Sequence, residues 1–299
     1  MKPLISFIVT YHNEPEAMQR ACLESIQALP LAKDEAEIIV VDDGSGQQSI
    51  IHNSQFIIQG DLQVRLIRQE QAGLSVARNT GIANAQGQYI QFVDADDQLI
   101  PSAYETVIGQ LKQSSPDLVH FRMSTKQVAA KANPQTRSWR GTSYLLHRNL
   151  RAGAWGYAFK REILGDLRFR PGLLHEDELF TPQLFLKAET LVELDVKAYF
   201  YRQHSGTITH SQTSEQVRKR LDDIHYILVE LKSLDNPLLE RRIRQLTVDY
   251  LQNTLTLTHS LSEFRCRKSE LRKEGFVPLP LRFYSLRYLF AAMITGFNF

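Results

Sequence analysis

The chain has 299 residues, enough for one large domain, or for one domain with a helical extension. Its composition, 43% hydrophobic and 23% charged, is that of an ordinary soluble protein, and its longest apolar runs fall short of the roughly 18 residues of a membrane-spanning helix. The net charge of +2 hides an asymmetry: residues 1–100 carry 6 Lys/Arg against 13 Asp/Glu, whereas residues 101–299 carry 29 against 20.

The two cysteines, Cys22 and Cys266, lie far apart in the sequence and cannot form a disulfide framework or a metal-ligand motif. Cys22 falls in an amphipathic helical stretch and is expected to be a small core residue. A reducing compartment therefore fits the chain. Because the sequence enters a strand directly, we expect no signal peptide and a cytoplasmic protein.

Three strands with little polar interruption are predicted at residues 4–11, 37–43 and 87–94, separated by helical stretches at 15–29 and 73–85. Continuous Val/Ile runs are typical of strands buried on both faces, as in a parallel sheet. The alternation of strands and helices predicts an α/β fold with a mixed, mostly parallel central sheet flanked by helices. In such sheets ligands bind beyond the carboxyl ends of the strands, so the polar residues after these strands should share one crevice.

The third strand runs directly into three carboxylates, Asp94, Asp96 and Asp97. Carboxylates held this close repel one another at neutral pH unless a hard divalent cation lies between them. Oxygen ligands of this kind suit Mg²⁺ or Mn²⁺, which in turn bind phosphate oxygens. The alternative is an acidic turn that follows an edge strand and binds nothing.

Four motifs in series resemble the family 2 glycosyltransferases, which are inverting enzymes with an A-type, nucleotide-diphospho-sugar-binding fold. The resemblance covers residues 4–100 and rests on Thr10-Tyr11-His12-Asn13, Val41-Asp42-Asp43-Gly44-Ser45, Gly73-Leu74-Ser75-Val76-Ala77-Arg78-Asn79-Thr80-Gly81, and the segment from Gly87 to Asp97. One such motif alone would be weak evidence, whereas four in order are specific.

The resemblance implies roles for these residues. Asp96 would bind Mn²⁺ or Mg²⁺, Asp94 would share the metal or face the ribose, and Asp97 would be a possible indirect ligand. The nucleotide, which we expect to be UDP, would contact Thr10 and Tyr11 in the base pocket, Asp43 or less readily Asp42 at the uracil edge, and Arg78 at the nucleotide or its phosphates.

A second block also resembles the family, whose acceptor half carries a tryptophan, a Lys/Arg pair and a Glu-Asp pair that opens a helix. Here these would be Trp155, Lys160-Arg161 and Glu176-Asp177. The resemblance implies that Trp155 binds the acceptor and that Asp177 is the catalytic base, with Glu176 orienting the acceptor. The alternative is that the two acids merely stabilise the first turn of a helix.

Between and after these blocks we expect a helix from Pro101 to about residue 114, a short strand at 117–121, a loop or irregular hairpin at 124–141, and a strand at 190–201. A polar loop follows, in which Arg202 or His204 could touch the diphosphate or the metal, the family often having a closing segment here. A solvated loop explains both residues equally well.

From residue 215 to about 262 the pattern is helical, with a break near Asn236-Pro237 and a core-facing apolar stripe at three- and four-residue spacing. We therefore expect a catalytic domain at residues 1–212, with a nucleotide half at about 1–100 and an acceptor half at about 101–212. Residues 213–299 would form a helical C-terminal extension.

The segment from Phe264 onward carries 7 Lys/Arg and 2 Asp/Glu together with many aromatic residues. This mixture suits peripheral contact with the inner face of a membrane through residues 276–299. Nucleic acid is a rival partner for a basic patch, but no nucleic-acid motif accompanies it, and we expect none to bind. The competing structural interpretation packs Phe283, Leu286, Phe290 and Met293 against a helical core.

The sequence thus predicts a metal-dependent glycosyltransferase that moves a sugar from a nucleotide donor to a saccharide or lipid-linked acceptor in surface polysaccharide synthesis. A nucleotidyltransferase would need a basic glycine-rich loop after the first strand, where Tyr11-His12-Asn13-Glu14 stands instead. A non-catalytic binding module is the other rival, and the presence of both acidic motifs argues against it.

Overall fold

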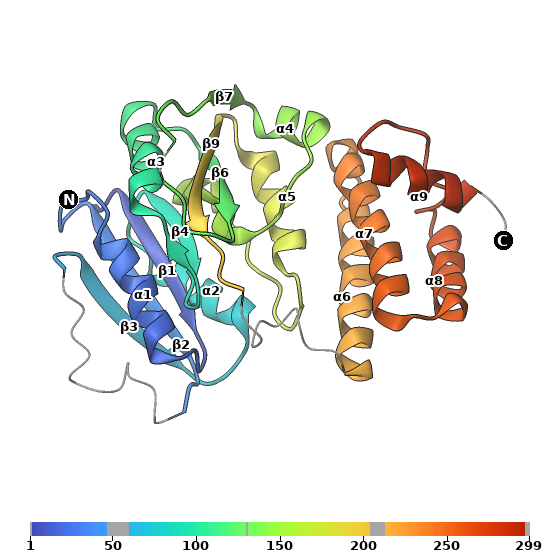
Figure 1. Ribbon diagram of the computed structural model, residues 1–299, viewed down its shortest axis with the longest axis horizontal. Coiled ribbons are helices and arrows are strands. Elements are labelled where there is room, and N and C mark those ends of the chain that lie inside the picture. Colours follow the sequence, from blue (N-terminus) through green and yellow to red (C-terminus); the bar gives the residue numbers. More distant parts are fainter. Residues whose placement is uncertain (1, 47–59, 130, 204–212, 297–299) are drawn as a thin grey trace. The chain divides into compact units, whose positions relative to one another are not determined.

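A computed structural model describes residues 2–46, 60–129, 131–203 and 213–296. The chain divides into two compact units, one made of residues 1–143 and 151–204 and the other of residues 144–150 and 205–299. Figure 1 shows the sheet of the first unit and the helices of the second. Each unit is described by itself.

The described part of the first unit forms a nine-stranded sheet in the order β3-β2-β1-β4-β8-β6-β9-β5, with β7 paired to β9. Strands β3, β2, β1 and β4 are parallel neighbours, whereas β8 runs antiparallel between β4 and β6. This confirms the predicted mixed, mostly parallel sheet. The strands are β1 Ile5–Tyr11, β2 Ala36–Asp43, β3 Gln63–Gln69, β4 Tyr89–Asp94, β5 Gln98–Leu99, β6 Leu118–Ser124, β7 Thr136–Trp139, β8 Tyr157–Lys160 and β9 Leu191–Phe200.

The helices of the first unit follow simple sequence rules. They are α1 Glu16–Gln27, α2 Leu74–Asn84, α3 Pro101–Gln113 and α5 Asp177–Lys187, and α4 Gly141–His147 lies where the two units meet in the sequence. In α1 the buried positions recur at helical spacing and include Cys22, which is a core residue as predicted. Helix α3 begins at Pro101, because proline lacks the N–H that an N-terminal position leaves unpaired.

Strand β1 is covered on both faces. Its odd-numbered residues join the core cluster that also contains residues of α1 and α3. On the other face Gly81 of α2 lies against Ile8, so close that a Cβ on Gly81 would stand 2.3 Å from Ile8 Cγ2. Burial on both faces explains why β1 reads as a continuous apolar run.

The second unit is helical in its described residues, with α6 Ser214–Ser233, α7 Glu240–Thr258, α8 Leu261–Lys273 and α9 Leu286–Gly296. Helix α6 begins with a reciprocal capping box between Thr213 and Gln216. The expected break near residue 236 is a 3₁₀ turn that starts at Pro237. The helical region continues past residue 262, where the sequence pattern had ended it.

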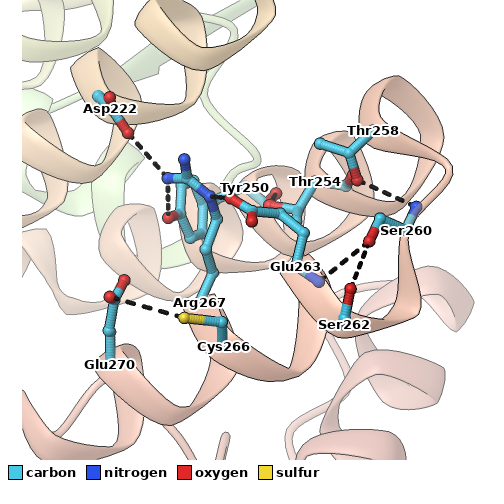
Figure 2. A network of polar contacts seen from close by, with 10 residues as sticks. All are labelled: Asp222, Tyr250, Thr254, Thr258, Ser260, Ser262, Glu263, Cys266, Arg267 and Glu270. Carbon is cyan, nitrogen blue, oxygen red and sulfur yellow. Dashed lines mark hydrogen bonds and ion pairs between the residues drawn. The ribbon is translucent and has the colours of Figure 1, made fainter.

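Arg267 ties three of these helices together, as Figure 2 shows. Its guanidinium donates to Glu263 on α8 (2.6 Å), to the hydroxyl of Tyr250 on α7 (2.9 Å) and to Asp222 on α6 (3.0 Å). Arg267 is only 9% exposed, so this cation belongs to the packing of the unit.

Candidate active site

Sheet register brings the first two predicted motifs together. Thr10 pairs with Asp94 across β1 and β4, and Tyr11 pairs with Asp42 across β1 and β2. Neighbouring parallel strands lie about 4.8 Å apart, so these side chains begin one strand spacing from one another. The carboxyl ends of β1, β2 and β4 therefore form one polar edge, as the strand pattern predicted.

Asp43, the last residue of β2, fixes the start of α2. Its carboxylate accepts hydrogen bonds from the Gln69 side chain (2.7 Å) and from the backbone N–H groups of Ala72 and Gly73 (2.8 Å each). Gly73 has a φ of +91°, which glycine adopts at little cost. Asp43 thus positions the helix that carries Arg78, and since a carboxylate offers about four acceptor positions, room remains for a ligand.

The neighbouring loop after β1 is tied to the turn after β2. Asp42 is fully buried and accepts a hydrogen bond from the backbone N–H of Ser45 (2.9 Å), while the Ser45 hydroxyl accepts from the backbone N–H of Asn13 (3.0 Å). His12 contacts the backbone carbonyl of Asp43 through Nδ1 at 2.8 Å. These bonds make the two loops one rigid rim of the site.

Arg78 lies in α2 at the centre of the acidic residues. Its guanidinium donates to Asp94 at 2.9 Å and also to Glu176, and it packs against the rings of Phe92 and Phe169. Burial alone would lower the pKa of Arg78, but Asp94, Glu176 and Asp177 raise it, so the group stays charged. At 2% exposure it binds protein carboxylates, and direct contact with a nucleotide would require this arrangement to change.

The Glu-Asp pair opens α5, as the sequence predicted. Glu176 is 5% exposed and makes no side-chain capping bond, because its carboxylate pairs with Arg78 instead. Asp177 is the first residue of the helix. Burial raises the pKa of Asp177 well above its usual range, with further increases from Glu176 and Glu178 and opposition from Arg78. A carboxylate whose pKa is raised in this way is a stronger base than an ordinary aspartate.

Asp96 and Asp97 lie in the turn after β4. Asp97 is 1% exposed and accepts a hydrogen bond from the backbone N–H of Arg202 (2.7 Å), whose Nε donates to the Asp96 carbonyl (2.9 Å). Burial, together with Asp94 and Asp96, raises the pKa of Asp97 to about 8. Arg202 therefore anchors the acidic turn from the end of β9. His204, the other candidate in that loop, lies outside the described residues.

Trp155 is connected to the end of β4, where the acidic turn begins, through its contact with Tyr199. Its ring lies on Tyr199 with centroids 4.8 Å apart and an interplanar angle of 17°, and the Tyr199 hydroxyl accepts a hydrogen bond from the backbone N–H of Asp94 (3.1 Å). Trp155 is only partly buried, which leaves part of its ring surface accessible. Tyr199 thus connects Trp155, the tryptophan predicted to bind the acceptor, to the acidic motif.

Two residues of this site were not singled out in the sequence. Burial raises the pKa of Glu14, and Asp96 and Asp94 raise it further, so this carboxylate belongs to the same acidic group. Its position just after β1 was a usable signal. Tyr199 lies inside the apolar run of β9, where nothing in the sequence distinguishes it from a core tyrosine.

The described residues contain no group of three or more His, Cys, Asp or Glu close enough to hold a metal ion by themselves. Mg²⁺ and Mn²⁺ sites in nucleotide enzymes commonly use one or two carboxylates and complete their shell with phosphate oxygens and water. The partly exposed Asp94 and Asp96 fit that type of site.

Comparison with known proteins decides the family. The family model described as "Glycosyl transferase family 2" matches residues 6–163. The chain belongs to glycosyltransferase family 2. The match contains the four N-terminal motifs and the tryptophan block, and it identifies the protein as a glycosyltransferase.

The chain is similar to a glycosyltransferase in its sequence and to a solved structure in its fold. It is 28% identical over 250 residues to "Glycosyltransferase GlyA" of Streptococcus pneumoniae, covering 78% of this chain and 35% of GlyA. The chain thus spans about a third of the length of that relative. Its fold resembles Staphylococcus aureus TarS residues 1–349 in complex with UDP-GlcNAc, with a TM-score of 0.65, 22% identity and coverage of 86% of this chain and 73% of the TarS chain.

A second structure shares the fold. The mannosyltransferase PcManGT of Pyrobaculum calidifontis, solved with GDP-Man and Mn²⁺, matches with a TM-score of 0.59 and 16% identity over 98% of this chain and 87% of that chain. These likenesses confirm the A-type glycosyltransferase fold. None of the helices in the described residues combines the length and the apolar character that crossing a membrane requires.

Proposed function

We propose that this family 2 enzyme transfers a sugar from a UDP-sugar to a hydroxyl of a saccharide or lipid-linked saccharide, with inversion and with Mn²⁺ or Mg²⁺. The observation that carries the proposal is Arg78, which joins Asp94 of the proposed donor site to Glu176 beside the proposed base. One buried cation binds both carboxylates, which supports a single site for the proposed donor and acceptor motifs.

The donor pocket follows from the polar edge of the sheet. Thr10 and Tyr11 would line the base pocket, and the carboxylate of Asp43, or that of Asp42, would accept a hydrogen bond from the uracil edge. TarS is described with UDP-GlcNAc and with UDP, which supports a uridine nucleotide here. Arg78 would act through Asp94, by holding the carboxylate that faces the ribose or the metal.

Asp96 and Asp94 would hold the divalent cation, with Asp97 behind them as an indirect ligand. When bound, the cation would neutralise the negative charge that develops on the leaving diphosphate. PcManGT is described with Mn²⁺, which supports this assignment. Without the positive charge of the cation, the carboxylates of Glu14, Asp94 and Asp96 would repel the negatively charged diphosphate.

The transfer would be a single displacement. The acceptor hydroxyl oxygen bonds to the anomeric carbon as the bond from that carbon to the diphosphate oxygen breaks, which inverts the configuration. The hydroxyl proton passes to the Asp177 carboxylate, whose raised pKa favours acceptance. Glu176, held by Arg78, would orient the acceptor or its base, and Trp155 would pack against an acceptor sugar.

The proposed biological role is surface polysaccharide synthesis. A relative of this chain, 25% identical over 200 residues and with 34% of its length covered, is the S. aureus poly(ribitol-phosphate) β-N-acetylglucosaminyltransferase TarS, which supports a polymer acceptor. We propose that the enzyme meets such an acceptor in the cytoplasm or at the inner face of the membrane.

The test is donor screening followed by turnover. UDP-sugars should raise the melting temperature of the purified chain when Mn²⁺ is present and not after chelation, and radiolabelled sugar should pass to an acceptor with inverted configuration. Binding without turnover on any acceptor would favour the binding module. Release of inorganic pyrophosphate from a nucleoside triphosphate and a sugar phosphate would favour a nucleotidyltransferase.

A further inference from the structure

Helix α9 is apolar on two opposite faces. Tyr288, Ala292 and Thr295 are buried in the helical unit. Leu286, Phe290 and Met293 are 78%, 63% and 50% exposed. At 100° per residue the exposed set lies on one stripe and the buried set about 180° away. The buried stripe makes the packing contacts of α9, and the exposed stripe faces solvent.

The apolar surface continues upstream of the helix, where Leu281 is 72% and Phe283 is 77% exposed. We call Leu281, Phe283, Leu286, Phe290 and Met293 the α9 surface. The competing structural interpretation, in which Phe283, Leu286, Phe290 and Met293 pack on the helical core, is wrong for these side chains. The core contacts of α9 are made by the opposite stripe.

The charges that the chain segment around the α9 surface itself carries are all positive. Residues 275–296 contain Arg282 and Arg287 and no Asp or Glu. Both arginines are exposed, although Arg287 also pairs with Asp249 at 2.7 Å. The end of α9 is held by further cations, because Lys268 donates to the Ile294 carbonyl (3.0 Å) and Arg272 donates to the Thr295 carbonyl (3.1 Å).

We propose that the α9 surface docks on an anionic lipid surface, with α9 lying in the plane of the interface. Eleven residues are too few to span a bilayer, but an apolar stripe can enter the boundary between head groups and acyl chains by about 5–10 Å. The exposed arginines beside it would then meet lipid phosphates.

A second copy of this chain fits less well. In a two-fold dimer the same surface would face itself, and Arg282 and Arg287 would approach their counterparts. Residues 275–296 offer no carboxylate to compensate Arg282, whereas Arg287 already pairs with Asp249 of α7. Anionic head groups supply that compensation, and charge complementarity therefore favours lipid.

The seven Lys/Arg from Phe264 onward are not all exposed. Arg267 and Lys268 are 9% and 8% exposed and bind partners inside the unit, as Figure 2 shows for Arg267. The exposed cations are Arg265, Arg272, Lys273, Arg282 and Arg287.

The test uses the full chain with vesicles of phosphatidylcholine alone and with vesicles that also contain phosphatidylglycerol. We expect sedimentation with the anionic vesicles at low salt, and weaker binding at high salt because exposed charges are screened. Leu286→Ser with Phe290→Ser should weaken binding more than about tenfold, since each side chain loses its burial in lipid. Arg282→Ser should weaken it about fivefold.

Matched controls separate the surface from general effects. Leu261→Ser removes a leucine that is 64% exposed outside the α9 surface, and Arg218→Ser removes an exposed arginine of α6; neither should change binding. Thermal melting should be the same in all variants, because every changed side chain is exposed.

Three results would overturn the proposal: wild-type protein that ignores anionic vesicles at low salt, binding that survives Leu286→Ser with Phe290→Ser, or a lipid-free dimer that those two changes dissociate. The proposal concerns a different part of the chain from the proposed reaction. Metal-dependent UDP binding measured in solution, without vesicles, would therefore remain a separate test of that reaction.

Discussion

Arg78 and Glu176 lie 98 residues apart in the sequence, yet the guanidinium of one binds the carboxylate of the other in a site where both are almost fully buried. The same guanidinium binds Asp94. A substitution at any of the three residues should therefore affect both the proposed donor site at Asp94 and the proposed base region at Glu176.

The first prediction measures this coupling. Arg78→Met should lower the free energy of unfolding by about 3–5 kcal/mol, because it leaves Glu176 buried without its cation. The double variant Arg78→Met with Glu176→Gln should lose less free energy of unfolding than the two single variants lose in sum. Urea unfolding of the three variants measures this difference. Arg20→Met, which breaks an exposed pair with Glu16, should cost below about 1 kcal/mol. Additive losses at Arg78 and Glu176 would contradict the coupling.

The second prediction concerns the metal. Asp96→Ala should abolish transfer and weaken Mn²⁺-dependent UDP binding, because it removes the main proposed oxygen ligand. Isothermal titration with and without Mn²⁺ measures this. Asp166→Ala, which removes an exposed acid elsewhere, should behave as the wild type. Unchanged Mn²⁺-dependent affinity in Asp96→Ala would refute the assignment.

The third prediction concerns the base. Asp177→Asn should lower kcat by about 10²–10⁴-fold, because the amide cannot accept the acceptor proton. UDP binding should stay close to that of the wild type, since Asp177 is assigned no donor contact. If Glu176→Gln lost the same turnover while Asp177→Asn remained active, the role of base would pass to Glu176.

The fourth prediction is a pH dependence. Asp177 must be ionised to accept a proton, and its pKa is raised, so kcat/KM should rise with pH through that raised pKa. Glu178→Gln removes one of the charges that raise this pKa, so the acid limb of the profile should move to lower pH. Glu189→Gln, an exposed change after α5, should leave the limb in place. A limb that moved equally in both variants would contradict the local electrostatic cause.

The sequence predicted β1, β2 and β4 well because burial on both faces leaves continuous apolar runs. Strand β3 was not predicted. It lies at the edge of the sheet, it contains Arg65 and Arg68, and none of its seven residues is buried, so it has no continuous apolar run. Strand β7, expected within a loop or irregular hairpin, pairs with β9 although three of its four residues are exposed. Edge strands carry little of the hydrophobic pattern on which such predictions depend.

The acidic motifs of the site could be read from the sequence, because each follows a strand or opens a helix. Their connections could not. The contacts of Arg78 with Asp94 and Glu176, and the path from Trp155 through Tyr199 to Asp94, join residues that only the folded sheet brings together. The roles assigned to these residues stay predictions until the variants above are measured.

The fifth prediction compares two glycines. Gly81→Ala should cost about 1–3 kcal/mol of folding free energy, because the new Cβ would meet Ile8 in a packed interface. Gly109→Ala, in the interior of α3 with open space around the new Cβ, should stabilise by about 0.5–1 kcal/mol. Thermal and urea unfolding of both variants measure the difference. If Gly81→Ala were more stable than the wild type, α2 and β1 would not be packed as closely as the distance from Gly81 to Ile8 indicates.

Strand β1 has parallel neighbours on both sides, β2 and β4, and supplies Thr10 and Tyr11 to the site. A single inserted or deleted residue within β1 would exchange the faces of the strand residues that follow it and would move both side chains at once. The length of this first strand is therefore constrained by both of its neighbours and by the site. Among relatives, length changes near the N-terminus should fall outside residues 5–11.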